Sequence, residues 1–206
     1  MVLKKYKLEN NNLKGYKIIH LSDFHNSRSK HKLKFIIDNI NKIKPNIIVI
    51  TGDLFDYYFY KANKVIDLLK NINDIPIYMV LGNHEQRIKK DIMPILTNNN
   101  VKLLNNENLL IDNLINIIGI NHNYNDLDNL IDNKYYNLLL THKPDNFWQF
   151  SQKNIDLILC GHTHGESFSK GLYEENNTTM IVSRGISATL FRIRFKTSEL
   201  VYIEFF

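Results

Sequence analysis

Residues 158–165 read Ile158-Leu159-Cys160-Gly161-His162-Thr163-His164-Gly165, an apolar run that ends in two histidines one residue apart between glycines. The pattern predicts a buried strand that carries two imidazoles at its exposed end. Because side chains at positions i and i+2 of an extended segment lie on the same face, His162 and His164 can converge on one point. Such a pair alone is weak support for a metal site, but four other stretches of the chain end in the same way.

Length and composition are those of one ordinary globular domain. The chain has 206 residues, of which 44% are hydrophobic and 23% charged. A prior of about 150 residues per domain favours a single domain over residues 1–206. The formal charge of +5 fits a phosphate-containing substrate, yet the lysines are scattered and form no dense basic block. A nucleic acid is therefore not favoured as the partner.

The cysteine content and the hydropathy pattern indicate the cellular compartment in which we expect the protein. The lone cysteine, Cys160, lies inside an apolar run, so it cannot form an intrachain disulfide and its expected role is core packing. Met1 to Tyr16 contains no apolar stretch of signal-peptide length, and nowhere do about 18 apolar residues run together. We therefore expect a cytoplasmic protein without a transmembrane segment.

The first half of the chain repeats one unit of strand, loop and helix. Strands are expected at 17–22, 47–51 and 77–81, and helices at 32–43, 62–71 and 91–98. Apolar strands that alternate with amphipathic helices predict βαβ units and a parallel sheet covered on both faces. Ligands of such sheets bind beyond the carboxyl ends of the strands.

The second half changes character after Val101. A hairpin is expected around Asp112 and Asn113, then strands at 136–141 and 155–160 with a helix at 145–152 between them, and closing strands at 180–183, 190–195 and 200–206. Because no helix separates the closing strands, we expect them to build a second, more antiparallel sheet.

Groups of the same chemical kind follow the strands. The candidates are Asp23, His25, Asp53, Asn83, His84, His142, His162 and His164. Mixed oxygen and imidazole ligands suit divalent Mn, Fe, Co, Ni or Zn. The set is too large for one ion and about right for two, which would lie about 3.5–4 Å apart and share a carboxylate. Asp53 is our candidate for the bridge, because its strand is the most apolar and hence the most central.

Each candidate also has an ordinary structural interpretation. Asp23 could cap the following helix, Asp53 and Asn83 could be turn residues, and His142 could be an exposed loop histidine. It is improbable that residues able to bind metal stand at all five strand ends for unrelated structural reasons. By contrast, His20 and His31 belong to no such motif and are expected to be structural or surface residues.

The order of these motifs resembles that of the calcineurin-like metallophosphoesterase superfamily. The motifs are Asp23-Phe24-His25, Gly52-Asp53, Gly82-Asn83-His84-Glu85, His142 and Gly161-His162-Thr163-His164. The resemblance spans nearly the whole chain. It implies an α/β fold, a four-layer α-β-β-α sandwich of two mixed sheets with helices on the outer faces.

The resemblance also implies roles for individual residues. One ion would be held by Asp23, His25, Asp53 and His164, and a second by Asp53, Asn83, His142 and His162. His84 would not be a ligand but would assist the leaving group, and Glu85 would orient His84 by accepting a hydrogen bond from it. Arg184 would add positive charge near the phosphate, although a surface arginine is an equal interpretation.

The expected activity is hydrolysis of a phosphomonoester or phosphodiester by a metal-bridging hydroxide. The segment from Gly171 to Gly185 resembles the bacterial branch that includes enzymes of lipid-linked phosphates, so the substrate is expected to be a small-molecule phosphate ester or a lipid head group. A metal-dependent nuclease is the alternative, since Tyr57, Tyr58, Phe59 and Tyr60 offer a stacking platform. A non-catalytic binding scaffold of the same fold is a weaker alternative. Such a scaffold should have lost metal ligands, and this sequence keeps all of them.

Overall fold

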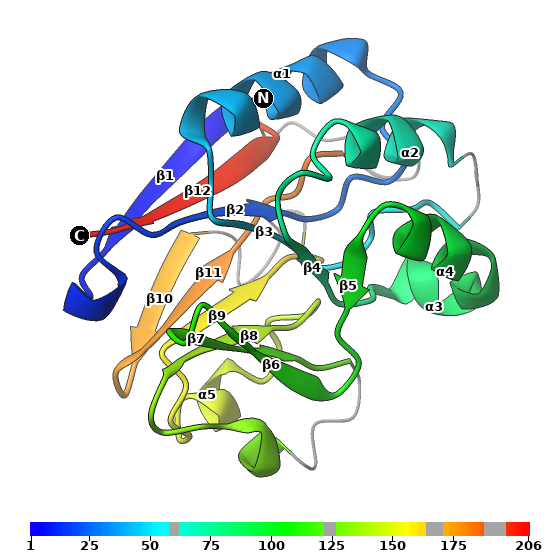
Figure 1. The fold of residues 1–206 in the computed structure, drawn as a ribbon. Helices are drawn as coiled ribbons and strands as arrows, with labels where there is room; N and C mark the ends of the chain where they lie inside the picture. Colours follow the sequence, from blue (N-terminus) through cyan, green and yellow to red (C-terminus); the bar gives the residue numbers. More distant parts are fainter. Residues whose placement is uncertain (58–61, 122–126, 164–170, 188–196) are drawn as a thin grey trace.

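The computed structural model describes residues 1–57, 62–121, 127–163, 171–187 and 197–206, which form two six-stranded sheets (Figure 1). In spatial order, the first sheet contains β1 (Val2–Leu8), β12 (Glu199–Phe205), β2 (Lys17–Leu21), β3 (Ile47–Ile50), β4 (Ile77–Met79) and β5 (Val101–Leu103). The second contains β10 (Gly171–Glu175), β11 (Thr178–Val182), β9 (Leu157–Cys160), β8 (Tyr136–Leu140), β7 (Ile115–Gly119) and β6 (Glu107–Ile111).

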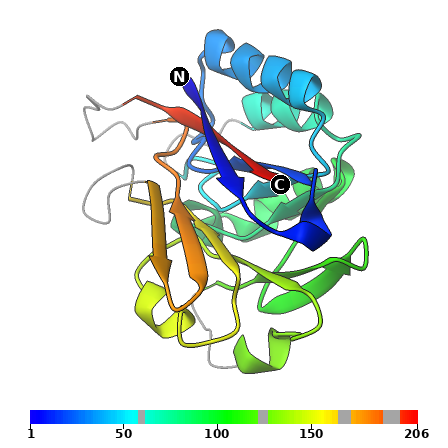
Figure 2. The same ribbon diagram turned by 90° about the vertical axis from the view of Figure 1, so that its left-hand side faces the viewer.

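Helices cover the outer face of each sheet. Next to the first sheet lie α1 (Lys30–Ile43), α2 (Asn63–Lys70), α3 (Asn83–Arg87) and α4 (Lys89–Asn98), and next to the second lie α5 (Phe147–Phe150) and the 3-10 helix η2 (Leu127–Leu130). A further 3-10 turn, η1 (Asn11–Leu13), follows β1. Figure 2 shows the two helical layers on opposite sides of the sheets, which confirms the predicted four-layer sandwich of mixed sheets.

The core follows from the alternation of side chains along each strand. In β3, Ile48 and Ile50 belong to the cluster beneath α1 and α2, whereas Ile47 and Val49 belong to the cluster between the sheets. In β9 the same alternation divides the side chains between the inter-sheet cluster and a third cluster beneath α5. The central strands of both sheets are buried on both faces, and this explains why they read as continuous apolar runs.

The predicted arrangement of the closing strands is wrong in one respect. The strand at the C-terminus, β12, lies in the first sheet, where it pairs parallel to β1 and antiparallel to β2. The second sheet is parallel from β7 through β8 and β9 to β11, with antiparallel pairs only at its two edges. Apolar alternation is the same for either sheet, so it carries no information on which sheet a strand joins. The strand expected at 190–195 lies outside the described residues.

Other predicted elements differ at their boundaries. The strands expected at 17–22, 47–51, 77–81 and 136–141 are present, and the hairpin around Asp112 pairs β6 with β7. The helix expected at 145–152 is a single turn, and α3 was not expected, since its first residues were assigned to a loop. No helix in the described part of the chain combines the length and the apolar character needed to cross a bilayer.

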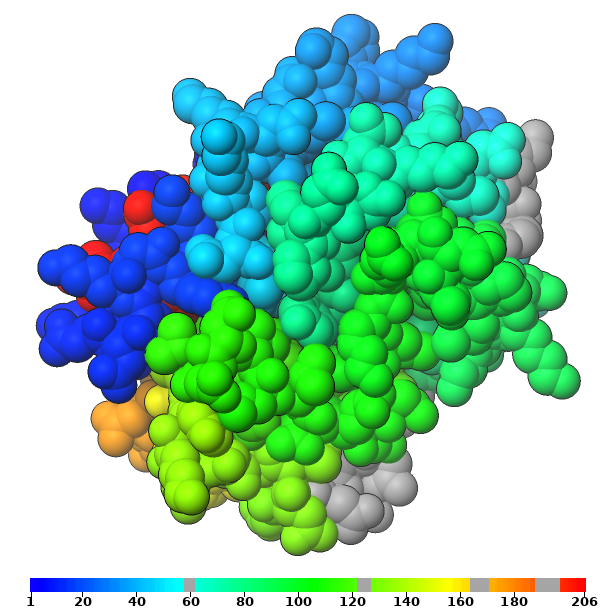
Figure 3. Space-filling model, viewed as in Figure 1, coloured from blue at the N-terminus to red at the C-terminus, as the bar shows by residue number. Residues whose placement is uncertain are grey.

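The two sheets bring their carboxyl edges together. In the space-filling view, the green residues that end the first half of the chain lie between the cyan helical layer and the yellow-green residues of the second sheet (Figure 3). Contacts between residues place the loops after β2 and β3 against those after β8 and β9: Asp53 Oδ2 lies 3.4 Å from His142 Nε2, and the backbone N–H of His162 donates to Asp23 Oδ2 (3.1 Å). Ligand sites of parallel sheets lie at such carboxyl edges.

Candidate active site

Four of the predicted metal ligands have a left-handed backbone. The φ angles are 54° at Asp23, 47° at His25, 52° at Asp53 and 66° at His162. Such residues cost roughly 1–3 kcal/mol each and persist only where the surrounding structure holds them. Here the backbone N–H of Asp23 donates to Gly52 O (3.1 Å), and that of His25 donates to Asp53 O (3.0 Å). The first two loops therefore hold each other in shape.

Glycines allow the loops to approach this closely. A Cβ atom on Gly82 would contact Asp53 Oδ1, and one on Gly161 would contact Ser22 Oγ. At Gly185 a Cβ atom would lie 2.6 Å from Asp23 Cβ, and its φ of +73° also disfavours other residues. The space around Asp23 and Asp53 thus depends on glycine, without a side chain, at positions 82, 161 and 185.

His142 is the centre of one group of donor atoms. Its Nδ1 lies 2.7 Å from Thr51 O, and because a carbonyl only accepts, Nδ1 carries a proton. Its Nε2 faces Asn83 Oδ1 at 3.1 Å, Asp53 Oδ2 at 3.4 Å and His162 Nδ1 at 3.0 Å. In the neutral tautomer, Nε2 therefore directs a lone pair at two oxygens, an arrangement that requires a proton or a cation between them. The donor set fits a divalent ion of the borderline class.

A second group shares Asp53 with the first. Nε2 of His25 lies 3.8 Å from Asp53 Oδ2 and 3.9 Å from Asp23 Oδ1. Donor atoms of His25, Asp53 and His84 lie within 4.8 Å of one another, as do those of Asp53, His142 and His162. Asp53 thus belongs to both groups, and its Oδ2 faces histidines on two sides. The remaining predicted ligand, His164, lies outside the described residues.

The charges at the site favour cations. Burial opposes ionisation of Asp53, but the hydrogen bond and charge of His142 outweigh it, helped by His25 and His84, and lower the pKa of Asp53. Burial likewise opposes the charging of His142, yet Asp53 raises the pKa of His142 to about 9. Burial and then the charge of His142 lower the pKa of His162 to about 4, which keeps His162 neutral and able to act as a ligand.

Glu85 does not have the predicted role. Its Oε2 accepts the backbone N–H groups of Asp53 and Gly82, and its Oε1 accepts that of Phe55, each at 2.8 Å. Its carboxylate accepts no hydrogen bond from His84, because adjacent helical residues point about 100° apart. Burial and the charge of Asp53 raise the pKa of Glu85 to about 7, against the N–H donors that favour its ionised form. Glu85 therefore holds the loop that carries Asp53.

Asp56 and Tyr57 both contact His84, although the sequence analysis gave neither a role in orienting it. The backbone N–H of Tyr57 donates to His84 Nδ1 (3.1 Å), and Asp56 Oδ1 lies 3.7 Å from the same atom. The ring of His84 stands edge-on to that of His25, with centroids 4.7 Å apart. A signal for Asp56 was present in the sequence, since it follows Asp53 by three residues in the same short loop.

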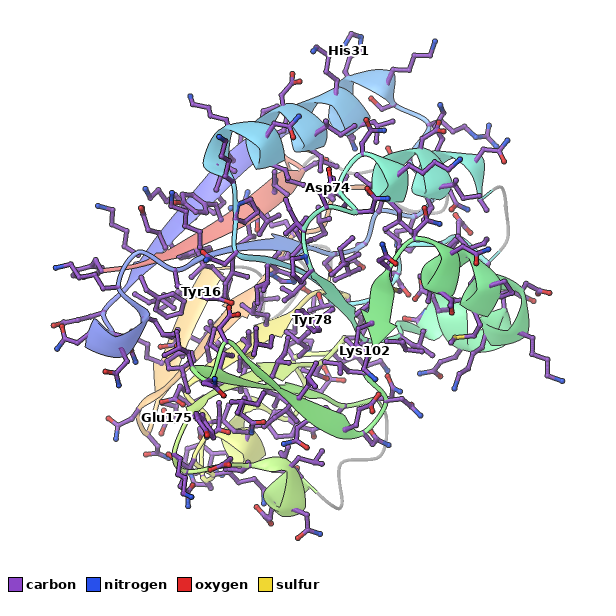
Figure 4. All side chains as sticks on the ribbon, viewed as in Figure 1. Tyr16, His31, Asp74, Tyr78, Lys102 and Glu175 are labelled. Carbon is purple, nitrogen blue, oxygen red and sulfur yellow. The ribbon has the colours of Figure 1, made fainter. Side chains whose placement is uncertain are left out.

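The other predicted residues lie in different surroundings. Arg184 is directed to Glu199, with Nε 3.6 Å from Oε2, so its contact with a phosphate stays a prediction. His20 is fully buried and its Nε2 lies 2.7 Å from Thr51 Oγ1, whereas His31 lies exposed at the outer end of α1 (Figure 4). Of the stacking platform predicted at 57–60, only Tyr57 is described, and Arg87 lies over its ring at 4.8 Å.

Comparisons with known proteins concern the family and the fold of the chain. A family model described as calcineurin-like phosphoesterase matches residues 16–166. The uncharacterized metallophosphoesterase YkuE of Bacillus subtilis is 27% identical over 88% of this chain and 75% of its own length. An uncharacterized metallophosphoesterase of Campylobacter jejuni is 29% identical over 98% of this chain, which spans only 62% of that relative.

The fold is also that of a solved structure. A dimetal phosphatase from Danio rerio superposes with a TM-score of 0.57 over 84% of this chain and 88% of its own, at 10% sequence identity. At so low an identity the likeness concerns the fold alone.

Proposed function

The chain belongs to the calcineurin-like phosphoesterase family, whose members are metal-dependent hydrolases of phosphoesters, and from this we propose that it cleaves a phosphomonoester or phosphodiester at a dinuclear centre. The observation that carries the proposal is the position of Asp53. Its Oδ2 lies 3.4 Å from His142 Nε2 and 3.8 Å from His25 Nε2, between two groups of donors. A carboxylate shared in this way is what two neighbouring cations require.

The ligands divide between two ions. We assign Asp23, His25 and Asp53 to the first, together with His164, and Asp53, Asn83, His142 and His162 to the second. Two divalent ions bound there, with manganese as the first choice for assays, would lower the pKa of water and neutralise phosphate oxygens. Because Thr51 O accepts the proton on Nδ1, the Nε2 lone pair of His142 would be available to the second ion.

His84 acts on the leaving group. Because the N–H of Tyr57 occupies Nδ1, the proton of neutral His84 resides on Nε2, which can donate to an oxygen of the substrate. The backbone N–H of His84 donates to Asp53 Oδ1 (3.1 Å), so the position of His84 is coupled to that of the bridging carboxylate. The roles of Asp53 as bridge and of His84 as donor thus depend on the same short helix.

The test is an assay of metal-free and metal-loaded protein. We expect p-nitrophenyl phosphate or bis-p-nitrophenyl phosphate to be hydrolysed with Mn²⁺, and chelation to abolish activity and lower the melting temperature, because ions that bind only the folded chain add to its stability. Full activity in excess EDTA, with no metal detected by elemental analysis, would exclude the dinuclear centre. Single-stranded DNA cleaved faster than both esters would favour the nuclease instead.

A further inference from the structure

A small cavity adjoins the candidate metal centre on the side of the second sheet. Its volume is about 160 Å³, and His142 forms the wall that it shares with the metal centre. Ile120 and Phe150 make part of its lining apolar, and Gln86 of α3 also lines it. Pockets for drug-sized ligands measure about 300–1,000 Å³, so this one suits a much smaller group. A group bound here while its phosphate is at the metals would be the alcohol part of the substrate.

Two residues of opposite charge line this cavity, the half-buried Lys143 and the exposed Asp145. Lys143 and Asp145 are two residues apart, directly after His142, and both contribute to the wall. They form no ion pair with each other, and neither side chain is engaged in an ion pair or hydrogen bond anywhere in the described part of the chain. A cation and an anion that face one small cavity without neutralising each other are available to a ligand that carries both charges.

Asn121 also lines this cavity, and its side chain is held by neighbouring asparagines. Its side-chain nitrogen donates to Asn105 Oδ1, and its backbone N–H donates to Asn106 Oδ1 (3.0 Å). Its Oδ1 is buried and accepts no hydrogen bond in the described structure. A ligand in the cavity cannot reach an atom without exposed surface, so its recognition rests on Lys143 and Asp145.

We propose that this cavity binds the leaving alcohol of the substrate, and that this alcohol is a small zwitterion with a carboxylate for Lys143 and an ammonium for Asp145. The inference rests on the proposed phosphoesterase function. For the simplest such substrate, O-phosphoserine, one water adds its oxygen to phosphorus, the bond from phosphorus to the serine oxygen breaks, and serine leaves with a proton beside inorganic phosphate.

Four phosphate esters test the two charges separately. O-phosphoserine carries both, 3-phosphoglycerate only the carboxylate, phosphoethanolamine only the ammonium, and glycerol 3-phosphate neither. With the Mn²⁺-loaded protein we expect kcat/KM to rise about tenfold for each charge that is present, the scale of one charge-assisted hydrogen bond. If only diesters are hydrolysed, the same four alcohols are supplied as methyl phosphodiesters.

Variants then assign each charge to a residue. Lys143→Gln should reduce the ratio of kcat/KM between phosphoserine and phosphoethanolamine towards one, and Asp145→Asn should do so for phosphoserine against 3-phosphoglycerate. Lys134→Gln is the matched control, because exposed Lys134 precedes β8 whereas Lys143 follows it, and it should leave both ratios unchanged.

The outcomes separate this inference from the proposed function. Equal kcat/KM for all four esters, or kcat/KM ratios that Lys143→Gln and Asp145→Asn leave unchanged, would overturn the inference that the leaving alcohol is a zwitterion. Hydrolysis of p-nitrophenyl esters would still support a phosphoesterase in that case. No hydrolysis of any ester with any divalent metal would instead overturn the proposed function itself.

Discussion

Asp53 places its Oδ2 atom 3.4 Å from Nε2 of His142, although Asp53 follows β3 of the first sheet and His142 follows β8 of the second. This contact joins the carboxyl edges of the two sheets at one point. It also makes Asp53 common to two groups of donor atoms, so a change at Asp53 should affect both metals together.

Asp53→Asn should therefore lower metal content and activity more than the loss of a ligand that serves one ion, such as His162→Ala. Replacing the carboxylate removes the shared negative charge and one oxygen ligand. Elemental analysis should find fewer than two metals per chain. The control is Asp74→Asn, at an exposed position apart from the centre (Figure 4). Retention of two tightly bound ions with near-normal turnover would exclude Asp53 as the bridge.

His84→Ala should reduce kcat by about 10²–10⁴-fold while metal content is unchanged, because in the proposed mechanism His84 donates a proton and is not a metal ligand. The loss should be largest for alkyl esters, whose leaving oxygen is basic, and smallest for p-nitrophenyl esters. His31→Ala, on the exposed face of α1, is the matched control. The proximity of His84 to His25 and Asp53 makes metal analysis decisive, since loss of an ion would identify His84 as a ligand.

Glu85→Gln should destabilise the protein. The neutral amide presents one oxygen where the carboxylate uses two to accept three backbone N–H groups, and a buried donor left without a partner costs about 1–3 kcal/mol. Thermal unfolding measures the effect, with Glu174→Gln on the exposed face of β10 as control. If Glu85→Gln kept a normal melting temperature but changed how kcat depends on the leaving group, Glu85 would after all have the predicted role of orienting His84.

Gly185→Ala and Gly15→Ala form a matched pair, because both glycines have positive φ, +73° and +84°. No atom lies within 4 Å of a Cβ on Gly15, so that variant should lose only the roughly 1–2 kcal/mol of an unfavourable backbone. A Cβ on Gly185 would also lie 2.6 Å from Asp23 Cβ. We expect the Gly185 variant alone to lose metal, as measured by elemental analysis. Equal metal content in both variants would show that the loop of Asp23 tolerates displacement.

His20 should make the stability of the metal-free protein fall in acid. Burial lowers its pKa from 6.5 to about 3, so folding favours the neutral ring. The contribution of His20 is fully present above pH 6.5 and is lost as the pH falls towards 3, with a slope of about 1.4 kcal/mol per pH unit. Denaturant unfolding at several pH values should show a shallower slope for His20→Gln and an unchanged one for His31→Gln.

Much of the fold could be predicted because it depends on local patterns. The apolar runs that became β2, β3, β8 and β9 and the helical spacing of α1 are properties of neighbouring residues. The predicted length of the helix at 145–152 was too great. A turn of four residues, Phe147–Phe150, covers the second sheet there. Helix α3 was missed because its first residues read as a loop motif.

The amino-acid sequence alone determined the chemistry of the site, since the carboxylates, amide and imidazoles and their positions at strand ends follow from residue type and local alternation. The tertiary structure decided what depends on distances between residues remote in the chain. It determined that β12 pairs with β2 in the first sheet and that Glu85 binds the loop of Asp53 instead of His84. It also brought one oxygen of Asp53 within reach of histidines from both sheets, because only packing of the sheets brings those atoms together.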